Sequence, residues 1–154
     1  MKNTTLCYIE KDNKYLMLYR NKKKNDINEG KYIGIGGHFE EGESPYDCVK
    51  REVKEEAGID LISPQYRGII TFASSTCESE QMHLFTCTEF EGEISECNEG
   101  ELKWISKSDL KSIPMWSGDI IFLEKLDTSP DFFSMKLVYE DEKLIEVEID
   151  GTKC

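Results

Sequence analysis

Long apolar runs are absent from this sequence of 154 residues. None approaches the roughly 18 residues that a membrane-spanning helix requires. The opening segment, MKNTTLCYIEKDNKYL, also lacks the apolar core of a secretory signal peptide. We therefore expect a cytoplasmic protein that does not have a membrane as its partner.

Positive charge is scarce. The chain carries 19 Lys and Arg against 31 Asp and Glu, which gives a formal net charge of −12. The phosphates of duplex nucleic acid and of anionic membranes repel such a chain, so neither is expected as its main partner. A small phosphate-bearing substrate meets the same repulsion unless a bound cation offsets it locally.

Paired cysteines are missing as well. The six cysteines show no CxxC pair and no zinc-like spacing, and they are Cys7, Cys48, Cys77, Cys87, Cys97 and Cys154. We interpret them as free thiols in a reducing compartment. The sequence has no repeat and no low-complexity linker, and its 38% of hydrophobic residues can form a real core. A single domain over residues 1–154 is expected.

The most informative segment that is present runs from Gly37 to Ile59, GHFEEGESPYDCVKREVKEEAGI. Ser44 and Pro45 form a helix start, since serine caps the first turn and proline suits its first position. Gly58 can adopt the left-handed conformation that ends a helix. Apolar residues recur at helical spacing and predict a buried stripe, at positions Tyr46, Val49, Val53 and Ala57.

Carboxylates are crowded along this predicted helix. Glu52, Glu55 and Glu56 stand at i, i+3 and i+4, so they share one face. Arg51 is suited to a bidentate hold on one of the carboxylates. Carboxylates packed this densely repel one another unless a cation binds, so we expect a divalent metal and attack on phosphate. The candidate metal ligands are the carbonyl of Gly37 and the side chains of Glu43, Glu52, Glu55 and Glu56.

The segment resembles the box of the Nudix (MutT-type) hydrolases, G-x5-E-x7-R-E-U-x-E-E-x-G-U with U aliphatic, and departs from it at no fixed position. The resemblance implies a Nudix-type three-layer α/β/α sandwich of the α/β (α+β) class, with a mixed β-sheet. It also implies hydrolysis of a nucleoside diphosphate linked to another group, with Mg2+ or Mn2+ as the cofactor. Catalytic roles would fall to Arg51, Glu55 and Glu56.

Members of this family often take an extra carboxylate from the loop before a strand that contains a tryptophan. Here Trp104 is that tryptophan, and Glu101 and Glu99 stand three and five residues before it. Either one is a candidate metal ligand or general base, with Glu101 taken as the catalytic candidate. A glutamate of the box is a further candidate for the base.

The remainder of the chain shows both strand and helix patterns. Strands are predicted at 6–9, 15–19, 32–35, 66–73, 83–90 and 102–105, and a closing hairpin is predicted from strands 132–139 and 144–149. Helices are predicted at 107–111 and 119–126. This order predicts a mixed sheet flanked by helices.

Candidates for substrate binding lie outside the box, and they are Arg20, Lys22, Trp116 and Asp119. Arg20 and the run from Lys22 to Lys24 form the main basic cluster, which either receives distal phosphates or is a solvated loop. Trp116 offers a flat surface on which a base can stack, worth about 1–3 kcal/mol, or else it is a core residue.

The region around Trp116 resembles the purine-recognising end of the animal 8-oxo-dGTP diphosphatases. Trp116 matches their tryptophan, and Asp119 matches the second of their two adjacent aspartates. Gly118 and Ile33 stand where those enzymes have the first aspartate and an asparagine, so the resemblance at the base-reading positions is incomplete.

The favoured substrate is a small-molecule nucleotide, a purine (d)NTP that includes oxidised forms, cleaved to the monophosphate and pyrophosphate. ADP-ribose, a dinucleoside polyphosphate or a capped RNA end are alternatives with the same mechanism. A nucleotide-binding module without turnover is a different class, which the intact glutamates of the box argue against. Isopentenyl diphosphate isomerase-like chemistry needs a cysteine motif that the sequence lacks. Monomer and homodimer both stay open.

Overall fold

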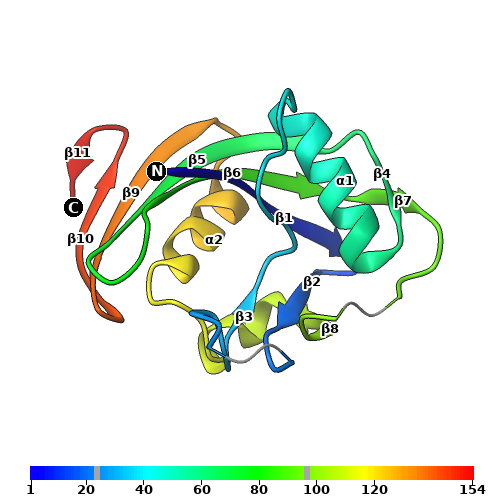
Figure 1. Cartoon of the computed structure of the whole chain (residues 1–154), viewed down its shortest axis with the longest axis horizontal. Coiled ribbons are helices and arrows are strands. Elements are labelled where there is room, and N and C mark those ends of the chain that lie inside the picture. The colour runs from blue at the N-terminus through cyan, green and yellow to red at the C-terminus, as the bar shows by residue number, and fades with distance from the viewer. Residues whose placement is uncertain (23–24, 96–97) are drawn as a thin grey trace.

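The computed structural model describes residues 1–22, 25–95 and 98–154. Within these ranges a nine-stranded mixed sheet has the order β11-β10-β9-β5-β6-β1-β2-β3, and β8 also pairs with β2 (Figure 1). Its strands are β1 (Lys2–Lys11), β2 (Lys14–Tyr19), β3 (Tyr32–Ile33), β5 (Gln65–Ser74), β6 (Glu80–Cys87), β8 (Glu101–Ser106), β9 (Phe133–Glu140), β10 (Lys143–Ile149) and β11 (Thr152–Lys153). The pairs β1–β6 and β5–β9 are parallel. A second sheet pairs β4 (Asp60–Ile62) with β7 (Glu89–Glu91).

Two α-helices cover opposite faces of the main sheet, α1 (Pro45–Ala57) and α2 (Asp119–Thr128). Tyr8 and Ile9 are neighbours in β1 and both are fully buried, so their side chains point to opposite faces. Tyr8 belongs to the core cluster that contains Phe122 of α2. Ile9 belongs to the cluster that contains Val49 and Val53 of α1. The three-layer sandwich with a mixed sheet is therefore confirmed.

Helix α1 begins and ends where its sequence predicts. Ser44 is the N-cap and forms a capping box with Asp47, in which each side chain accepts the other residue's amide at 3.1 Å. Gly58 is the C-cap, with φ at 74°. The expected burial of Tyr46 was wrong, because this side chain is 43% exposed. It lies in the first turn, where its ring contacts Phe85 edge-on instead of entering the core.

Several strands differ in length from their predictions. The strand predicted at 6–9 extends from Lys2 to Lys11, because its polar first residues pair in register with β6. The single strand predicted at 83–90 is two strands, since β6 ends at Cys87 and Glu89–Glu91 turns away to pair with β4. The predicted strand 32–35 stops at Ile33. The predicted helix 107–111 is a 3-10 helix, Lys107–Ser112.

Other sequence expectations agree with the structure. The closing hairpin is formed by β9 and β10, which pair in antiparallel fashion. Five cysteines are free thiols, and Cys97 lies outside the described residues. Across the described ranges, no helix is both long and apolar enough to cross a membrane.

Candidate active site

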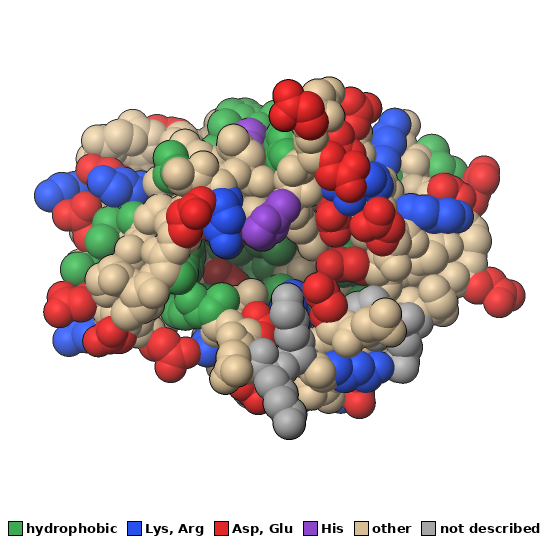
Figure 2. Space-filling model, viewed as in Figure 1, with side chains coloured by type: hydrophobic (Ala, Val, Ile, Leu, Met, Phe, Trp, Pro, Cys, Tyr) green, Lys and Arg blue, Asp and Glu red, His purple; other side chains and the backbone are tan. Residues whose placement is uncertain are grey.

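A cavity of about 520 Å3 opens between α1, β1 and the segment that leads from β2 to β3. Figure 2 shows the hollow near the middle of this face, with acidic side chains gathered on its α1 side and hydrophobic ones inside. One end of the cavity is lined by Glu52, Glu56 and Glu99. The other end is lined by Phe72, Trp116 and other apolar side chains, as well as by Asp119.

Helical spacing brings two of the predicted glutamates to the cavity. Glu52 and Glu56 are one turn apart on α1, and both line the cavity wall. Glu56 is 9% exposed, and one of its oxygens accepts the Gly36 amide at 3.3 Å. The side chain of Glu55 is 57% exposed and contacts Arg51 on the outer surface at 3.2 Å. The predicted acidic face of the helix is thus divided between the cavity and solvent.

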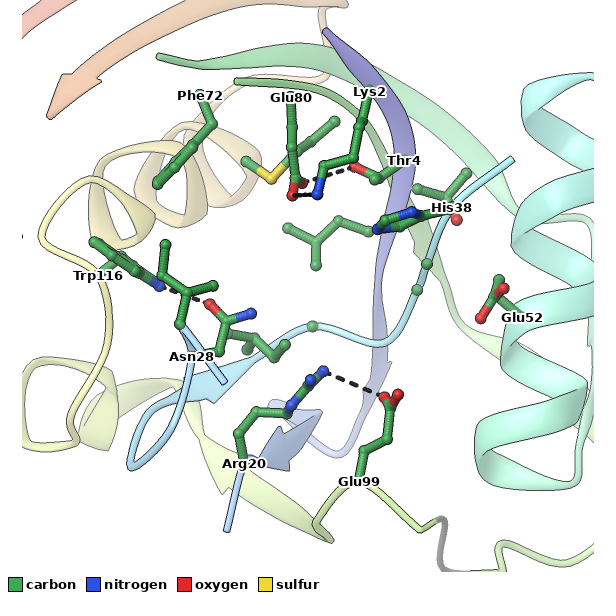
Figure 3. Close-up of a pocket in the computed structure, with 18 of the residues that line it drawn as sticks. Lys2, Thr4, Arg20, Asn28, His38, Glu52, Phe72, Glu80, Glu99 and Trp116 are labelled. Carbon is green, nitrogen blue, oxygen red and sulfur yellow. Dashed lines mark hydrogen bonds and ion pairs between the residues drawn. The ribbon is translucent and has the colours of Figure 1, made fainter. Parts of the chain in front are cut away.

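A carboxylate from the loop before β8 completes the acidic end. Glu99 lies within hydrogen-bonding reach of Glu56, and its oxygen accepts from Arg20 at 3.2 Å (Figure 3). Burial raises the pKa of Glu56 well above its usual range, and the nearby charges of Glu99 and Glu52 raise it further. Glu101 is the first residue of β8, and its side chain pairs with Lys103 at 3.4 Å. It is not among the described residues that line the cavity.

Arg51 organises the carboxylates on the outer side of the cavity. Its Nε and Nη2 bind both oxygens of Glu43, at 2.7 and 2.8 Å, so the expected bidentate hold is confirmed. Its Nη1 donates to Glu52 at 2.7 Å, and its Nη2 donates to the carbonyl of His38 at 2.9 Å. The Arg51 guanidinium lowers the pKa of Glu43 to about 2. Arg51 therefore holds the Glu52 carboxylate from the outer side of the cavity, and Glu43 holds the Arg51 guanidinium.

Gly37 lies where backbone and carboxylate come closest. A Cβ atom added to Gly37 would lie 2.4 Å from an oxygen of Glu52, so a side chain at this position displaces that carboxylate. The Gly37 carbonyl accepts the Thr5 amide at 2.9 Å and is thereby tied to β1. Over the described ranges, no group of three or more His, Cys, Asp or Glu side chains is arranged to hold a metal ion.

Trp116 serves as a core residue and also lines the cavity. It is 6% exposed, and its ring meets Phe72 and Tyr139 in edge-on contacts. Lys31 Nζ lies 4.6 Å from the ring centroid. The indole Nε1–H donates to Oδ1 of Asn28 at 2.8 Å (Figure 3). Both interpretations of the tryptophan are therefore compatible with its position.

Asp119 is a buried carboxyl at the same end of the cavity. It is 6% exposed, and within the described chain its carboxyl has no hydrogen-bond partner. Burial raises the pKa of Asp119 to about 8. Its neighbour Gly118 cannot be replaced by a larger residue without movement, because an added Cβ would lie 2.6 Å from Leu137 and 2.9 Å from the Tyr139 hydroxyl. An aspartate at position 118 would therefore require β9 or the turn to move.

The basic loop contributes only part of its predicted cluster to the cavity. Arg20 lines it and binds Asp26 at 2.6 Å as well as Glu99. Lys22 is exposed, and it is not among the described residues of the lining. The remaining lysines of the run, at 23 and 24, lie outside the described residues.

Among the lining residues that sequence reasoning missed are Asp26, Asn28, Phe72 and Met82. Strand parity could have indicated Phe72, because it stands two residues after the buried Ile70 along β5 and so faces the same side of the sheet. The same parity relates Met82 to the buried Leu84 in β6. Asn28 lies in an irregular polar loop, where no periodicity indicates the direction of a side chain.

Comparisons with family models, with known proteins and with solved structures agree on one family. The model of the NUDIX domain family matches residues 2–126. The chain is 33% identical over 124 residues to the uncharacterized Nudix hydrolase YvcI of Bacillus subtilis, covering 77% of this chain and 75% of that one. It is 26% identical over 129 residues to an oxidized purine nucleoside triphosphate hydrolase of Danio rerio, covering 83% of each. The crystal structure of a MutT protein from Bacillus halodurans superposes with a TM-score of 0.87 at 27% identity, covering 97% of this chain and 98% of that one.

Proposed function

The chain belongs to the Nudix family, and from that premise we propose that it hydrolyses purine (d)NTPs, including oxidised forms, to the monophosphate and pyrophosphate. The observation that carries this proposal is one continuous cavity with two different ends. Its acidic end suits a metal-bound phosphate chain, whereas the end at Trp116 and Asp119 suits a flat base with a polar edge. The similarity to the Danio rerio enzyme supports the same choice of substrate.

The acidic end has the donor chemistry that a hard divalent cation requires. Burial raises the pKa of Glu56, the neighbouring carboxylates of Glu99 and Glu52 raise it further, and a bound cation would offset their negative charge. The described side chains are not arranged around a metal ion as they stand, so we propose that Glu52, Glu56 and Glu99 close on Mg2+ or Mn2+ when it binds, with backbone oxygen from the Gly36–Gly37 turn. When bound, the metal supplies charge neutralisation at the phosphates and activation of water.

The chain's own residues then position and deprotonate the attacking water. Glu99 is our candidate for the extra carboxylate that accepts the proton, because Arg20 holds it beside Glu56 in the cavity. This choice is preferred to Glu101, whose side chain pairs with Lys103 instead. Arg51 acts through Glu52, since it holds this ligand without lining the cavity itself. Glu55, on the outer surface, remains a weaker candidate for proton transfer.

Purified protein with Mg2+ and a nucleotide panel tests the proposal, with pyrophosphate and phosphate release followed separately. We expect pyrophosphate from purine triphosphates, 8-oxo-dGTP among them. Activity on ADP-ribose alone would overturn the substrate, and binding without turnover of any member would overturn the enzyme. A Glu99→Gln variant should lose activity, with Glu101→Gln as the matched control in the same segment.

We also propose that residues 1–154 act as one domain. Strand β9 lies beyond the region matched by the family model, yet it pairs along its length with β5 in the middle of the main sheet. Deleting the final hairpin would expose the buried face under α2, which is rich in apolar side chains from β9. A separate measurement, sedimentation of the whole chain, decides between monomer and homodimer.

A further inference from the structure

The side-chain amide of Asn28 has only one possible orientation. Its Oδ1 accepts the indole N–H of Trp116 at 2.8 Å. An indole nitrogen can only donate, so the oxygen of the amide must face the ring and the NH2 group must face away. Figure 3 shows that this nitrogen is directed toward the open middle of the cavity. Among the described residues the NH2 group has no hydrogen-bond acceptor.

A chain of contacts holds Asn28 in place. Its backbone amide donates to Asp26 at 3.2 Å, and the other oxygen of Asp26 accepts from Arg20 at 2.6 Å. Arg20 in turn binds Glu99 at the acidic end. The Asn28 amide is therefore set before any ligand arrives, so little conformational entropy is lost when it binds one.

An NH2 group without a hydrogen-bond acceptor is unusual beside apolar side chains. Apolar side chains line the same cavity as the Asn28 amide, namely Leu6, Ile33, Phe72 and Met82. A flat heterocycle that enters between them excludes water from the Asn28 amide, which leaves its N–H groups unsatisfied unless the heterocycle offers an acceptor. The nature of that acceptor follows from the amide itself.

An asparagine with both ends free pairs with the adenine edge by donating to N7 and accepting from the 6-amino group. The Trp116 N–H holds the oxygen of Asn28 against the indole, so the NH2 group is the end of the amide that faces the cavity. We propose that Asn28 is a specificity-determining residue that donates a hydrogen bond to the 6-oxo group of the substrate base. The inference rests on the proposed function for its substrate class. Such a hydrogen bond would favour 6-oxopurines over 6-aminopurines.

The Asn28→Asp variant tests the role of the donor directly. Aspartate keeps an oxygen for the Trp116 N–H and replaces only the NH2 group, so the loop keeps its anchor. The ratio of KM for ATP to KM for GTP should fall by roughly 10-fold, with little change in the ratio of kcat values. Asn25→Asp adds the same charge in the same loop outside the described lining, and it should leave the ratio unchanged.

Calorimetric binding of GMP and AMP without metal separates this inference from the proposed function. A wild-type preference for GMP that Asn28→Asp removes supports the role of Asn28, even if no nucleotide is hydrolysed. An equal affinity for both nucleotides, no binding of either, or a preference that survives in Asn28→Asp overturns it. Loss of hydrolysis with the binding preference intact overturns only the proposed function.

Discussion

At the scale of single residues, Glu56 combines a buried position with neighbouring negative charge. Its carboxyl has a raised pKa in the folded protein, so ionisation at neutral pH acts against folding in the absence of a cation. Without a cation the protonated form of Glu56 is therefore favoured, and a divalent metal that binds this carboxylate has to displace the proton.

Glu56→Gln should therefore affect activity and stability in opposite directions. Turnover should fall by at least about 100-fold, because a proposed metal ligand is lost. The free energy of unfolding at pH 8 should stay equal or rise, since glutamine does not have to take up a proton on folding as this buried carboxyl does. Urea unfolding and pyrophosphate release measure the two effects. An unchanged rate would remove Glu56 from the metal site, and Glu101→Gln provides the matched control.

Asp119 gives a pH-dependent prediction. Burial raises its pKa from 3.8 to about 8, so the folded protein binds this proton more tightly than the unfolded chain does. Its contribution to stability is present at low pH and is lost as pH rises toward about 8. The Asp119→Asn side chain cannot ionise. As pH rises from 5 to 8, the free energy of unfolding of this variant should therefore increase relative to that of the wild type by about 2–4 kcal/mol. Parallel unfolding curves would contradict a buried acid at this position.

The box spacing predicted individual residues well where helix geometry applies and poorly elsewhere. Glu52 and Glu56 lie in the cavity because a spacing of four residues places them on one face. Glu55 was grouped with them by the same spacing, yet the breadth of the acidic face leaves it in solvent. The choice between Glu99 and Glu101 depends on where β8 begins. The orientation of the Asn28 amide depends on the Trp116 indole, which lies 88 residues away in the sequence.

At the scale of elements, α2 and its preceding turn are fixed by a single small residue. Gly118 precedes the helix with φ at −79°, a conformation open to any residue, so its role is steric and not conformational. Its amide donates to the Tyr139 hydroxyl at 2.7 Å, which draws the turn against β9. Closeness to β9 is therefore what positions Trp116 and Asp119 on either side of this glycine.

Gly118→Ala should destabilise the fold. The added methyl group would meet Leu137 at 2.6 Å inside a packed core, and overpacking of this kind costs about 1–3 kcal/mol. The loss should appear in thermal and urea unfolding, together with weaker nucleotide binding. Ser117→Ala, at the exposed neighbouring position, should change stability by less than about 0.5 kcal/mol. Equal stabilities of the two variants would show that the turn moves freely.

Element boundaries illustrate what local patterns can predict. The limits of α1 were predicted because Ser44 and Gly58 carry their own capping chemistry. The limits of β1 were not, since its polar first residues are strand only through pairing with β6. The short pair of β4 and β7 likewise exists through pairing between distant segments, and neither strand is long enough to show a period.

At the scale of the whole molecule, the net charge of −12 acts on the two ligands in opposite ways. The cavity lining adds to this field, because it contains six described carboxylates and only Lys2, Arg20 and His38 as basic groups. A divalent cation is attracted to such a site, and a nucleotide without metal is repelled from it. The metal therefore has to offset the field of the entire chain as well as that of its own ligands.

Ionic strength should separate the two effects. Raising salt from about 20 to about 200 mM shortens the distance over which the field acts, to below about 10 Å. The Kd for Mn2+ should then rise several-fold, whereas the Kd for GMP without metal should fall, because screening weakens attraction and repulsion alike. Calorimetry measures both, with KCl as the only variable. Reversing charge to lysine at Glu89 and Glu91, two exposed positions of β7 outside the described lining, should reduce both salt slopes. Slopes of the same sign for cation and nucleotide would contradict control by the overall field.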